Sequence, residues 1–250
     1  MAIGKSVQKF MRKYFGFVPK YMGYIPEYYV LGAEKKIPLD EIEGFSPIAI
    51  KVLAEQRTYL HLDRLYILWQ ALSHVPSSSI VIEVGAYRGG SAKFIHNALR
   101  YMGKQSKFYV CDTFSGHPVV DESVDGDHKT TEGFKNTSAA DVQKYMSDCW
   151  NFEIVAGDIM KISEPFYNSL TAHGKGIGML HLDCDVYPPT KFCLEHFGRD
   201  MVYGGVIVVD DYGFKSCKGV KKAVDEYLAY RRDFRAFHLT TGQMVLVCIQ

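Results

Sequence analysis

The 250-residue chain lacks several features that mark other classes of protein. Its six cysteines form no C-x-x-C pair, and the chain is too long for a small disulfide-framed secreted domain. It has no apolar run of about eighteen residues, as a transmembrane helix needs, and no N-terminal apolar core followed by a cleavage site. The formal net charge of +1 gives no support to a nucleic-acid partner. We therefore predict a cytoplasmic protein with reduced thiols and no transmembrane segment.

The chain also lacks internal repeats and low-complexity tracts, and its length suits one α/β domain with an N-terminal extension. We place the extension at residues 1–56 and the domain at residues 57–250. Within the extension, residues 4–30 mix lysines and arginines with tyrosines and phenylalanines. Such an arm either contacts a membrane or a partner, or packs across its own domain or a second subunit. The second alternative predicts a homo-oligomer.

The most informative stretch is Ile80–Ser91, which reads IVIEVGAYRGGS. An apolar β-branched run, a glycine turn and the resumption of helical spacing predict a buried strand, a tight turn and a helix start. Gly85 lets the backbone leave the strand, and Ser91 is placed to cap the helix. The carboxylate of Glu83 at the strand tip would repel a phosphate but suits hydroxyls or a cationic amino group. The glycine spacing does not match the G-x-G-x-x-G fingerprint of dinucleotide-binding proteins.

Two further acids follow predicted strands. Asp112 ends the strand Lys107–Asp112, about twenty positions beyond the glycines, where an acid in nucleoside-binding α/β folds bonds ribose hydroxyls. Asp158 follows the strand Phe152–Ala156, where it would either accept from adenine N6 or form a Gly-Asp turn. Between these strands lies an unpatterned loop over residues 113–139, which is typical of a lid or substrate-binding segment and holds His117 and His128.

Four acids gather at two later strand tips. The strand Ile177–Asp183 is followed by Asp185, and the strand Gly205–Asp211 ends in Asp210 and Asp211. Tips of parallel strands lie close together, and like charges that close destabilise one another unless a cation or a proton compensates. Oxygen ligands without histidine or cysteine pairs favour a hard divalent ion, Mg²⁺ first. The alternative is that some of these acids cap the following helices.

The C-terminal segment predicts a helix over Ser216–Arg231 and then two strands, Phe234–Leu239 and Gln243–Ile249, joined by a short turn. Such a turn makes the last two strands antiparallel. The predicted fold is therefore α/β and Rossmann-like, with a seven-stranded mostly parallel sheet, a C-terminal antiparallel hairpin and helices on both faces.

Four motifs in this order resemble those of the macrocin O-methyltransferase (TylF/MycF-like) family of class I S-adenosylmethionine (SAM) methyltransferases. They are EVGAYRGGS over Glu83–Ser91, CDTFSGHP over Cys111–Pro118, LDCDVY over Leu182–Tyr187 and VVDDY over Val208–Tyr212. The similarity runs from about Arg57 to the C-terminus, and it is the combination of motifs that is specific.

The resemblance implies an Mg²⁺-dependent, SAM-dependent enzyme that methylates a hydroxyl of a sugar or glycosylated small molecule. By position, Glu83, Gly85 and Ser91 would lie at the methionine and ribose parts of SAM, Asp112 would hold the ribose hydroxyls, and Phe114 would lie near adenine. Asp183, Asp210 and Asp211 would bind the metal; of Asp183 and Asp185, one is expected to be a ligand and the other the catalytic base.

Three other interpretations compete with this one. The first is a metal-independent SAM methyltransferase, whose strand-tip acids only accept hydrogen bonds. The second is a non-catalytic scaffold with the same fold that binds a partner through its aromatic arm. The third is a nicotinamide oxidoreductase, which the glycine spacing and the terminal hairpin disfavour.

Overall fold

A single seven-stranded sheet forms the centre of the molecule in the computed structural model, which describes residues 17–20, 23–26, 30–31, 34–35, 39–126, 132–172, 174 and 176–250. Its strands are β5 (Ile80–Val84), β6 (Lys107–Asp112), β7 (Phe152–Ala156), β8 (Ile177–Leu182), β9 (Met201–Val209), β10 (Phe234–His238) and β11 (Met244–Cys248). They lie in the order β10-β11-β9-β8-β5-β6-β7. The predicted strands are all present, with ends within a few residues of their expected positions.

The directions of the strands confirm the predicted topology. β7, β6, β5, β8 and β9 pair in parallel, whereas β11 runs antiparallel to both β9 and β10. The chain passes from β5 to β6 on one side and later returns to β8 on the other side of β5. The order of the strands therefore reverses between β5 and β8, and in open α/β sheets this switch point is where ligands bind.

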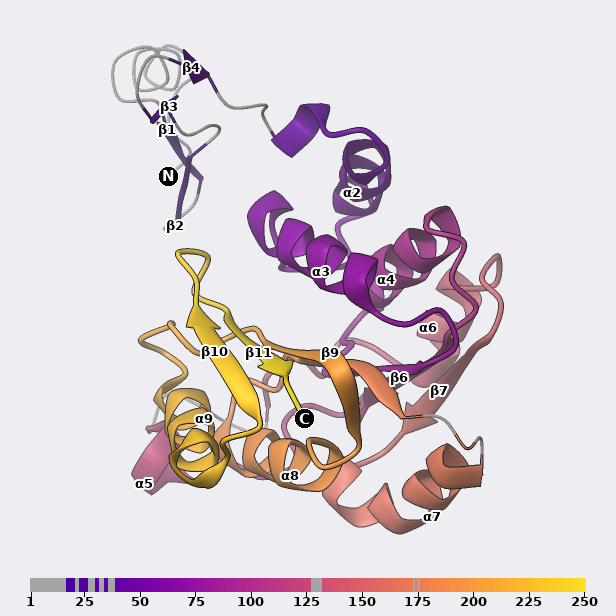
Figure 1. The fold of residues 1–250 in the computed structure, drawn as a ribbon, viewed down its shortest axis with the longest axis vertical. Coiled ribbons are helices and arrows are strands. Elements are labelled where there is room, and N and C mark those ends of the chain that lie inside the picture. Colours follow the sequence, from indigo (N-terminus) through magenta and orange to yellow (C-terminus); the bar gives the residue numbers. More distant parts are fainter. Residues whose placement is uncertain are drawn as a thin grey trace.

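Helices cover both faces of the sheet, as predicted (Figure 1). One face carries α2 (Phe45–Ala54), α3 (Leu62–His74), α4 (Gly90–Tyr101) and α6 (Ala139–Tyr145), and the other carries α7 (Ile159–Ala172), α8 (Tyr187–Phe197) and α9 (Lys218–Tyr230). Two shorter helices are α5 (Glu122–Asp125) and the 3₁₀ turn η1 (Leu39–Glu41). α8 begins with two prolines in its first turn, where their missing N–H groups cost nothing.

Side chains along the central strands point alternately to the two faces of the sheet, so the interior has two hydrophobic cores, one on each face. In β5, Ile80, Ile82 and Val84 pack with α7, α8 and α9, whereas Val81 packs with α2, α3 and α4. The same rule places Glu83 on the side of α3, because successive strand residues point to opposite faces. The register pairs Glu83 with His181 of β8, and His181 in turn lies opposite Val208 of β9. Polar groups therefore enter the core beneath α3.

The N-terminal part contributes directly to this second core. The ring of Phe45 in α2 lies 5.1 Å from that of Tyr66 and 5.9 Å from that of Phe94. Before it, β1 (Phe17–Lys20) pairs with β2 (Gly23–Pro26), and β3 (Val30–Leu31) pairs with β4 (Glu34–Lys35). The division of the chain after residue 56 stays a prediction, and most of the predicted basic arm lies outside the described residues.

The segment between β6 and α6 is anchored by a buried acid. Asp125 at the end of α5 accepts hydrogen bonds from the backbone N–H groups of Tyr187 (2.7 Å) and Asp121 (3.0 Å). Tyr187 opens α8, so the anchor holds this segment beside the tip of β8, where Asp183 and Asp185 lie. His128 falls outside the described residues. Over the described part of the chain, no helix is both long enough and apolar enough to cross a membrane.

Candidate functional site

A cavity opens at the carboxyl edge of the sheet, over the switch point between β5 and β8. Its walls come from the turns after β5, β6, β7, β8 and β9 and from the loop before α3. The lining residues are Arg57, Thr58, Tyr59, Leu60, Arg64, Val84, Gly85, Ala86, Tyr87, Ser91, Cys111, Asp112, Thr113, Gly116, His117, Pro118, Phe134, Gly157, Ile159, Asp183, Cys184, Asp185, Pro189 and Asp211.

The glycine turn after β5 brings the two predicted halves of the site together. Gly85 has a φ of 99°, which favours glycine, and a Cβ atom there would lie 1.9 Å from the carbonyl oxygen of Asp183. Gly89 is left-handed as well and precedes the first residue of α4. The turn therefore lies directly against the acidic tip of β8, with no room for a side chain between them.

We expect Gly85→Ala to destabilise the fold strongly. The added methyl group would force the tips of β5 and β8 apart and hold alanine in an unfavourable backbone region, at a cost of about 3 kcal/mol or more. Urea unfolding followed by circular dichroism would measure the loss. Gly103→Ala is the matched control, because Gly103 also has a positive φ (66°) but no atom within 4 Å of the added Cβ. Similar losses for the two variants would show that backbone strain alone is responsible.

Asp112 lies at the tip of β6 and lines the cavity. Its two carboxylate oxygens accept the backbone N–H groups of Tyr87 and Phe114, each at 2.7 Å. Burial raises the pKa of this carboxyl group, and the two N–H groups partly offset the effect. The carboxylate is thus fixed beside the glycine turn. Phe114 is not among the lining residues and instead packs against the core beneath α3 and α4.

The remaining predicted cofactor residues divide into two groups. Ser91 lines the cavity together with Gly85. Asp158 does not line it: its carboxylate accepts the N–H of Met160 (3.1 Å) at the start of α7, while the neighbouring Gly157 lines the cavity. This is the Gly-Asp turn that the sequence left open as an alternative. Glu83 is fully buried and also lies outside the lining.

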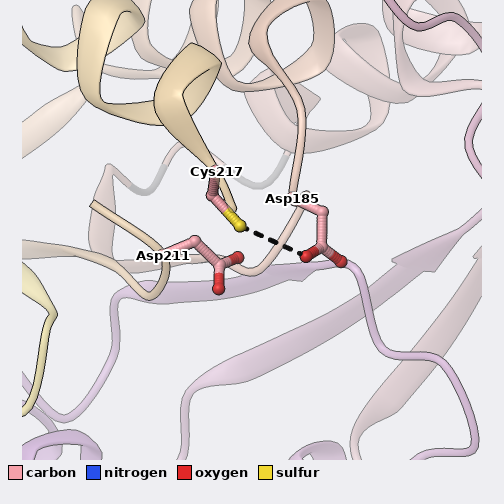
Figure 2. A group of neighbouring side chains, drawn as sticks. All are labelled: Asp185, Asp211 and Cys217. Atoms are coloured by element: carbon pink, nitrogen blue, oxygen red, sulfur yellow. Dashed lines mark hydrogen bonds between the residues drawn. The ribbon is translucent and has the colours of Figure 1, made fainter. Parts of the chain in front are cut away.

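The strand-tip acids form two overlapping groups. Carboxylate oxygens of Asp183, Asp210 and Asp211 all lie within 4.8 Å of one another, and so do ligand atoms of Asp185, Asp211 and Cys217. In the second group the Cys217 thiol donates to Asp185 Oδ1 at 3.6 Å, and the three side chains point toward one another (Figure 2). Asp211 belongs to both groups. The first group offers oxygen atoms only, which is the donor set that a hard divalent cation prefers.

The charge of these acids supports a cation at the first group. Burial raises the pKa of Asp183 well above its ordinary value, and the negative charges of Asp210, Asp211 and Asp185 raise it further. A divalent cation would reverse this effect by favouring the ionised form of each carboxylate. The residues present therefore fit Mg²⁺ in donor chemistry and charge.

A buried polar network continues from the acids into the core beneath α3. His181 Nδ1 lies 3.0 Å from Glu83 Oε1, and His181 Nε2 lies 3.9 Å from Asp210 Oδ1. Burial disfavours the charged imidazole, but the hydrogen bonds and charges of Asp210 and Glu83 outweigh it and raise the pKa of His181 to about 9. Glu83 therefore has an imidazole partner inside the protein, and its contact with a cofactor stays a prediction.

Arg64 belongs to this network and was not among the predicted site residues. Arg64 in the first turn of α3 forms an ion pair with Asp210, whose other oxygen accepts from Gln243 Nε2 at 2.8 Å. His181 could have been found, because a histidine inside the apolar strand IGMLHL needs a buried partner. Nothing in the local sequence links Arg64 to an acid 146 positions away.

Aromatic rings line one wall of the cavity. The rings of Tyr59 and Tyr87 stack with centroids 5.6 Å apart and planes 14° apart, and the edge of Phe134 meets both. His117, from the loop predicted to bind substrate, contacts Phe134 at 5.4 Å. Tyr59 is 65% exposed despite its size, so this wall presents a flat aromatic face to whatever enters the cavity.

Comparison with known proteins places these features in context. The profile of the family described as macrocin-O-methyltransferase (TylF) matches residues 57–236. Demethyldecarbamoylnovobiocin O-methyltransferase of Streptomyces niveus is 27% identical over 183 residues, which cover 70% of this chain and 69% of that protein. Mycinamicin III 3''-O-methyltransferase of Micromonospora griseorubida is 28% identical over 156 residues, 59% of each chain.

Solved structures share the fold. The O-methyltransferase NovP superposes with a TM-score of 0.66 at 21% identity over 78% of this chain and 83% of its own. TomG from Streptomyces achromogenes, an O-methyltransferase solved in complex with SAM, superposes with a TM-score of 0.53 at 16% identity over 84% of this chain and 91% of its own.

Proposed function

This chain belongs to the macrocin O-methyltransferase (TylF) family and is an O-methyltransferase, and on that premise we propose that it transfers a methyl group from SAM to a hydroxyl of a sugar or glycosylated small molecule with the help of Mg²⁺. The observation that carries the proposal is the contact between the glycine turn at Gly85 and the acidic tip at Asp183. It sets the predicted cofactor half and the predicted metal half of the site side by side in one cavity.

The cofactor half of the cavity suits an adenosyl group. Asp112 presents a fixed carboxylate to the cavity, and two adjacent ribose hydroxyls can both donate to one carboxylate. Gly85 and Ser91 line the cavity where the methionine part would lie, and Gly157 lines it after β7. Glu83 supports this half from beneath, through its hydrogen bond with His181.

The acceptor half suits a neutral, ring-shaped molecule with hydroxyls. Tyr59, Tyr87 and Phe134 offer flat faces on which the apolar face of a sugar ring can lie. The acids offer hydrogen-bond acceptors to hydroxyl groups at the other end of the cavity. The relatives act on demethyldecarbamoylnovobiocin and on mycinamicin III, which supports a glycosylated small molecule as the acceptor.

Transfer requires an acceptor oxygen that is held in line with the methyl group and made electron-rich. When bound, Mg²⁺ supplies a Lewis acid that makes a nearby hydroxyl more acidic, and SAM supplies the methyl group on a good leaving group. Asp183, Asp210 and Asp211 would hold the cation. Asp185 lies beside Asp211 and is the candidate base that takes the hydroxyl proton. The aromatic wall orients the acceptor and excludes water.

A metal-independent methyltransferase is the second candidate, because one observation favours it. Arg64 already supplies a positive charge to Asp210, so the acids are partly neutralised by the protein itself. In that case the carboxylates would position and deprotonate the acceptor without a cation. Sensitivity of methyl transfer to a chelator separates the two candidates.

The proposal extends to location and assembly. All six cysteines are free thiols, as expected in a reducing cytoplasm. The aromatic and basic composition of residues 4–30 supports a homo-oligomer in which this arm covers a second subunit. Light scattering after gel filtration would give the assembly state.

We expect SAM to bind with a defined 1:1 saturation that survives removal of divalent cations, because Asp112 and the backbone of the glycine turn, and not the carboxylates of Asp183, Asp210 and Asp211, are proposed to hold it. Isothermal titration with SAM and with its demethylated product, each with Mg²⁺ and with chelator, measures this. Methyl transfer to an acceptor from a panel of glycosides should vanish with chelator and return with added Mg²⁺.

Asp112→Ala supplies the control, since loss of the ribose contact should weaken SAM binding about tenfold or more. Absence of SAM binding under all conditions would overturn the proposed function. Binding with chelator-insensitive transfer would instead support the metal-independent candidate.

A further inference from the structure

The positively charged side chain of Arg64 already contacts one of the three acids proposed to bind Mg²⁺. We call these acids, Asp183, Asp210 and Asp211, the acid group. Arg64 Nη1 pairs with Asp210 Oδ2, and the Arg64 side chain is 13% exposed. Burial opposes its charge, but Asp210, Asp183 and Asp211 outweigh that and raise the pKa of Arg64. The side chain therefore neutralises part of the same negative charge that would attract a divalent ion.

Both carboxylate oxygens of Asp210 have partners inside the protein. One oxygen accepts from Gln243 Nε2 at 2.8 Å, and the other accepts from Arg64. Asp210 is completely buried, and both of its oxygens already accept hydrogen bonds inside the protein. A divalent ion that binds Asp183, Asp210 and Asp211 together would share the carboxylate of Asp210 with the Arg64 guanidinium, and two cations at one carboxylate repel each other.

We infer that Arg64 is the resident counter-ion of the acid group and that a divalent cation binds there by displacing its guanidinium from Asp210. This inference rests on the proposed metal site. It states that Arg64 of α3 competes with the divalent cation for the carboxylate of Asp210. The protein would thus remain stable without the cation, because the acids are never left uncompensated.

Displacement leaves Arg64 with other partners. Its Nη2 donates to the carbonyl oxygen of Tyr59 at 2.7 Å, and its guanidinium lies 5.4 Å from the ring centre of Phe214. Asp63, its neighbour in α3, adds a negative charge. The side chain can therefore leave Asp210 while keeping a hydrogen bond and a cation–π contact. Because Tyr59 belongs to the aromatic wall, movement of Arg64 away from Asp210 would also affect the acceptor half of the cavity.

The test is cation affinity itself, measured on the full chain by titration with Mn²⁺ and with Mg²⁺. Arg64→Gln removes the competitor and should tighten binding by about tenfold or more, as expected when one charge leaves a buried carboxylate group. Arg64→Lys keeps a cation and should stay near wild type. Arg57→Gln is the matched control, because Arg57 lines the same cavity but pairs with Asp141, outside the acid group.

The melting temperature is a second measurement, and it does not depend on the heats of titration. In chelator, Arg64→Gln should melt below wild type because its acids repel one another, and Mn²⁺ should raise its melting temperature by more than it raises that of wild type. Binding to wild type that weakens or stays unchanged in Arg64→Gln would overturn the inference alone. No cation binding in either protein would overturn the inference and the proposed Mg²⁺ site together, while SAM binding would still stand.

Discussion

Asp211→Asn is expected to lower the rate of methyl transfer by about a hundredfold or more while leaving SAM affinity almost unchanged. Asp211 is the one acid that belongs to both groups at the strand tips, so its charge serves the proposed cation and neighbours the candidate base Asp185. It lines the cavity at the tip of β9, and two strands, β8 and β5, separate that tip from the tip of β6, where Asp112 lies. Asparagine keeps the size of the side chain and removes only the charge.

The measurement pairs single-turnover methyl transfer with calorimetric SAM binding for wild type and variant. Asp158→Asn is the matched control, because it removes an acid from another strand tip whose carboxylate caps α7 outside the cavity. Its transfer rate should equal that of wild type. If SAM affinity fell as far as the rate in Asp211→Asn, the acid would belong to the cofactor half and the metal role would fail.

Asp210 would be a less informative target, although sequence alone treats it as equal to Asp211. Asp210 turns into the core beneath α3, where it contacts Arg64, His181 and Gln243. Replacing it leaves buried donors without an acceptor, which destabilises the protein whatever the effect on a cation. A loss of activity in Asp210→Ala would thus have two causes, whereas the loss in Asp211→Asn has one.

The strands and their acidic tips could be predicted because they depend on local patterns. Apolar β-branched runs ending in Asp or Gly mark buried parallel strands, and the Thr240–Gly242 turn marks the terminal hairpin. Parallel strands place their carboxyl ends at one edge, so the meeting of Asp112, Asp183 and Asp211 at one cavity follows from the order of the strands alone.

The direction of individual side chains could not be predicted as well. It depends on which face of the strand each residue occupies and on partners that lie far away in the sequence. Glu83 precedes the end of β5 by one residue, so it lies on the same face as Val81 and points to the core beneath α3. The partner that makes this burial tolerable, His181, comes from another strand 98 positions later. Arg64 similarly reaches the acids only because α3 packs across β9.

Glu83→Ala is expected to destabilise the protein by about 3 to 5 kcal/mol, which is the usual cost of removing one member of a buried charge pair. The carboxylate is fully buried and lies 3.0 Å from His181 Nδ1. Its loss leaves a buried imidazole that Asp210 alone must compensate. Glu83→Gln keeps an acceptor for the imidazole and should cost less than half as much.

Urea unfolding of the three proteins gives the free energies of unfolding, and SAM titration below the onset of unfolding gives the affinities. Because Glu83 is fully buried and does not line the cavity, the folded fraction of Glu83→Ala should bind SAM nearly as well as wild type. A variant of unchanged stability that binds SAM much more weakly would restore the direct cofactor contact that the family resemblance implied. The pair of measurements thus decides whether the carboxylate at the tip of β5 serves the ligand or the core that carries it.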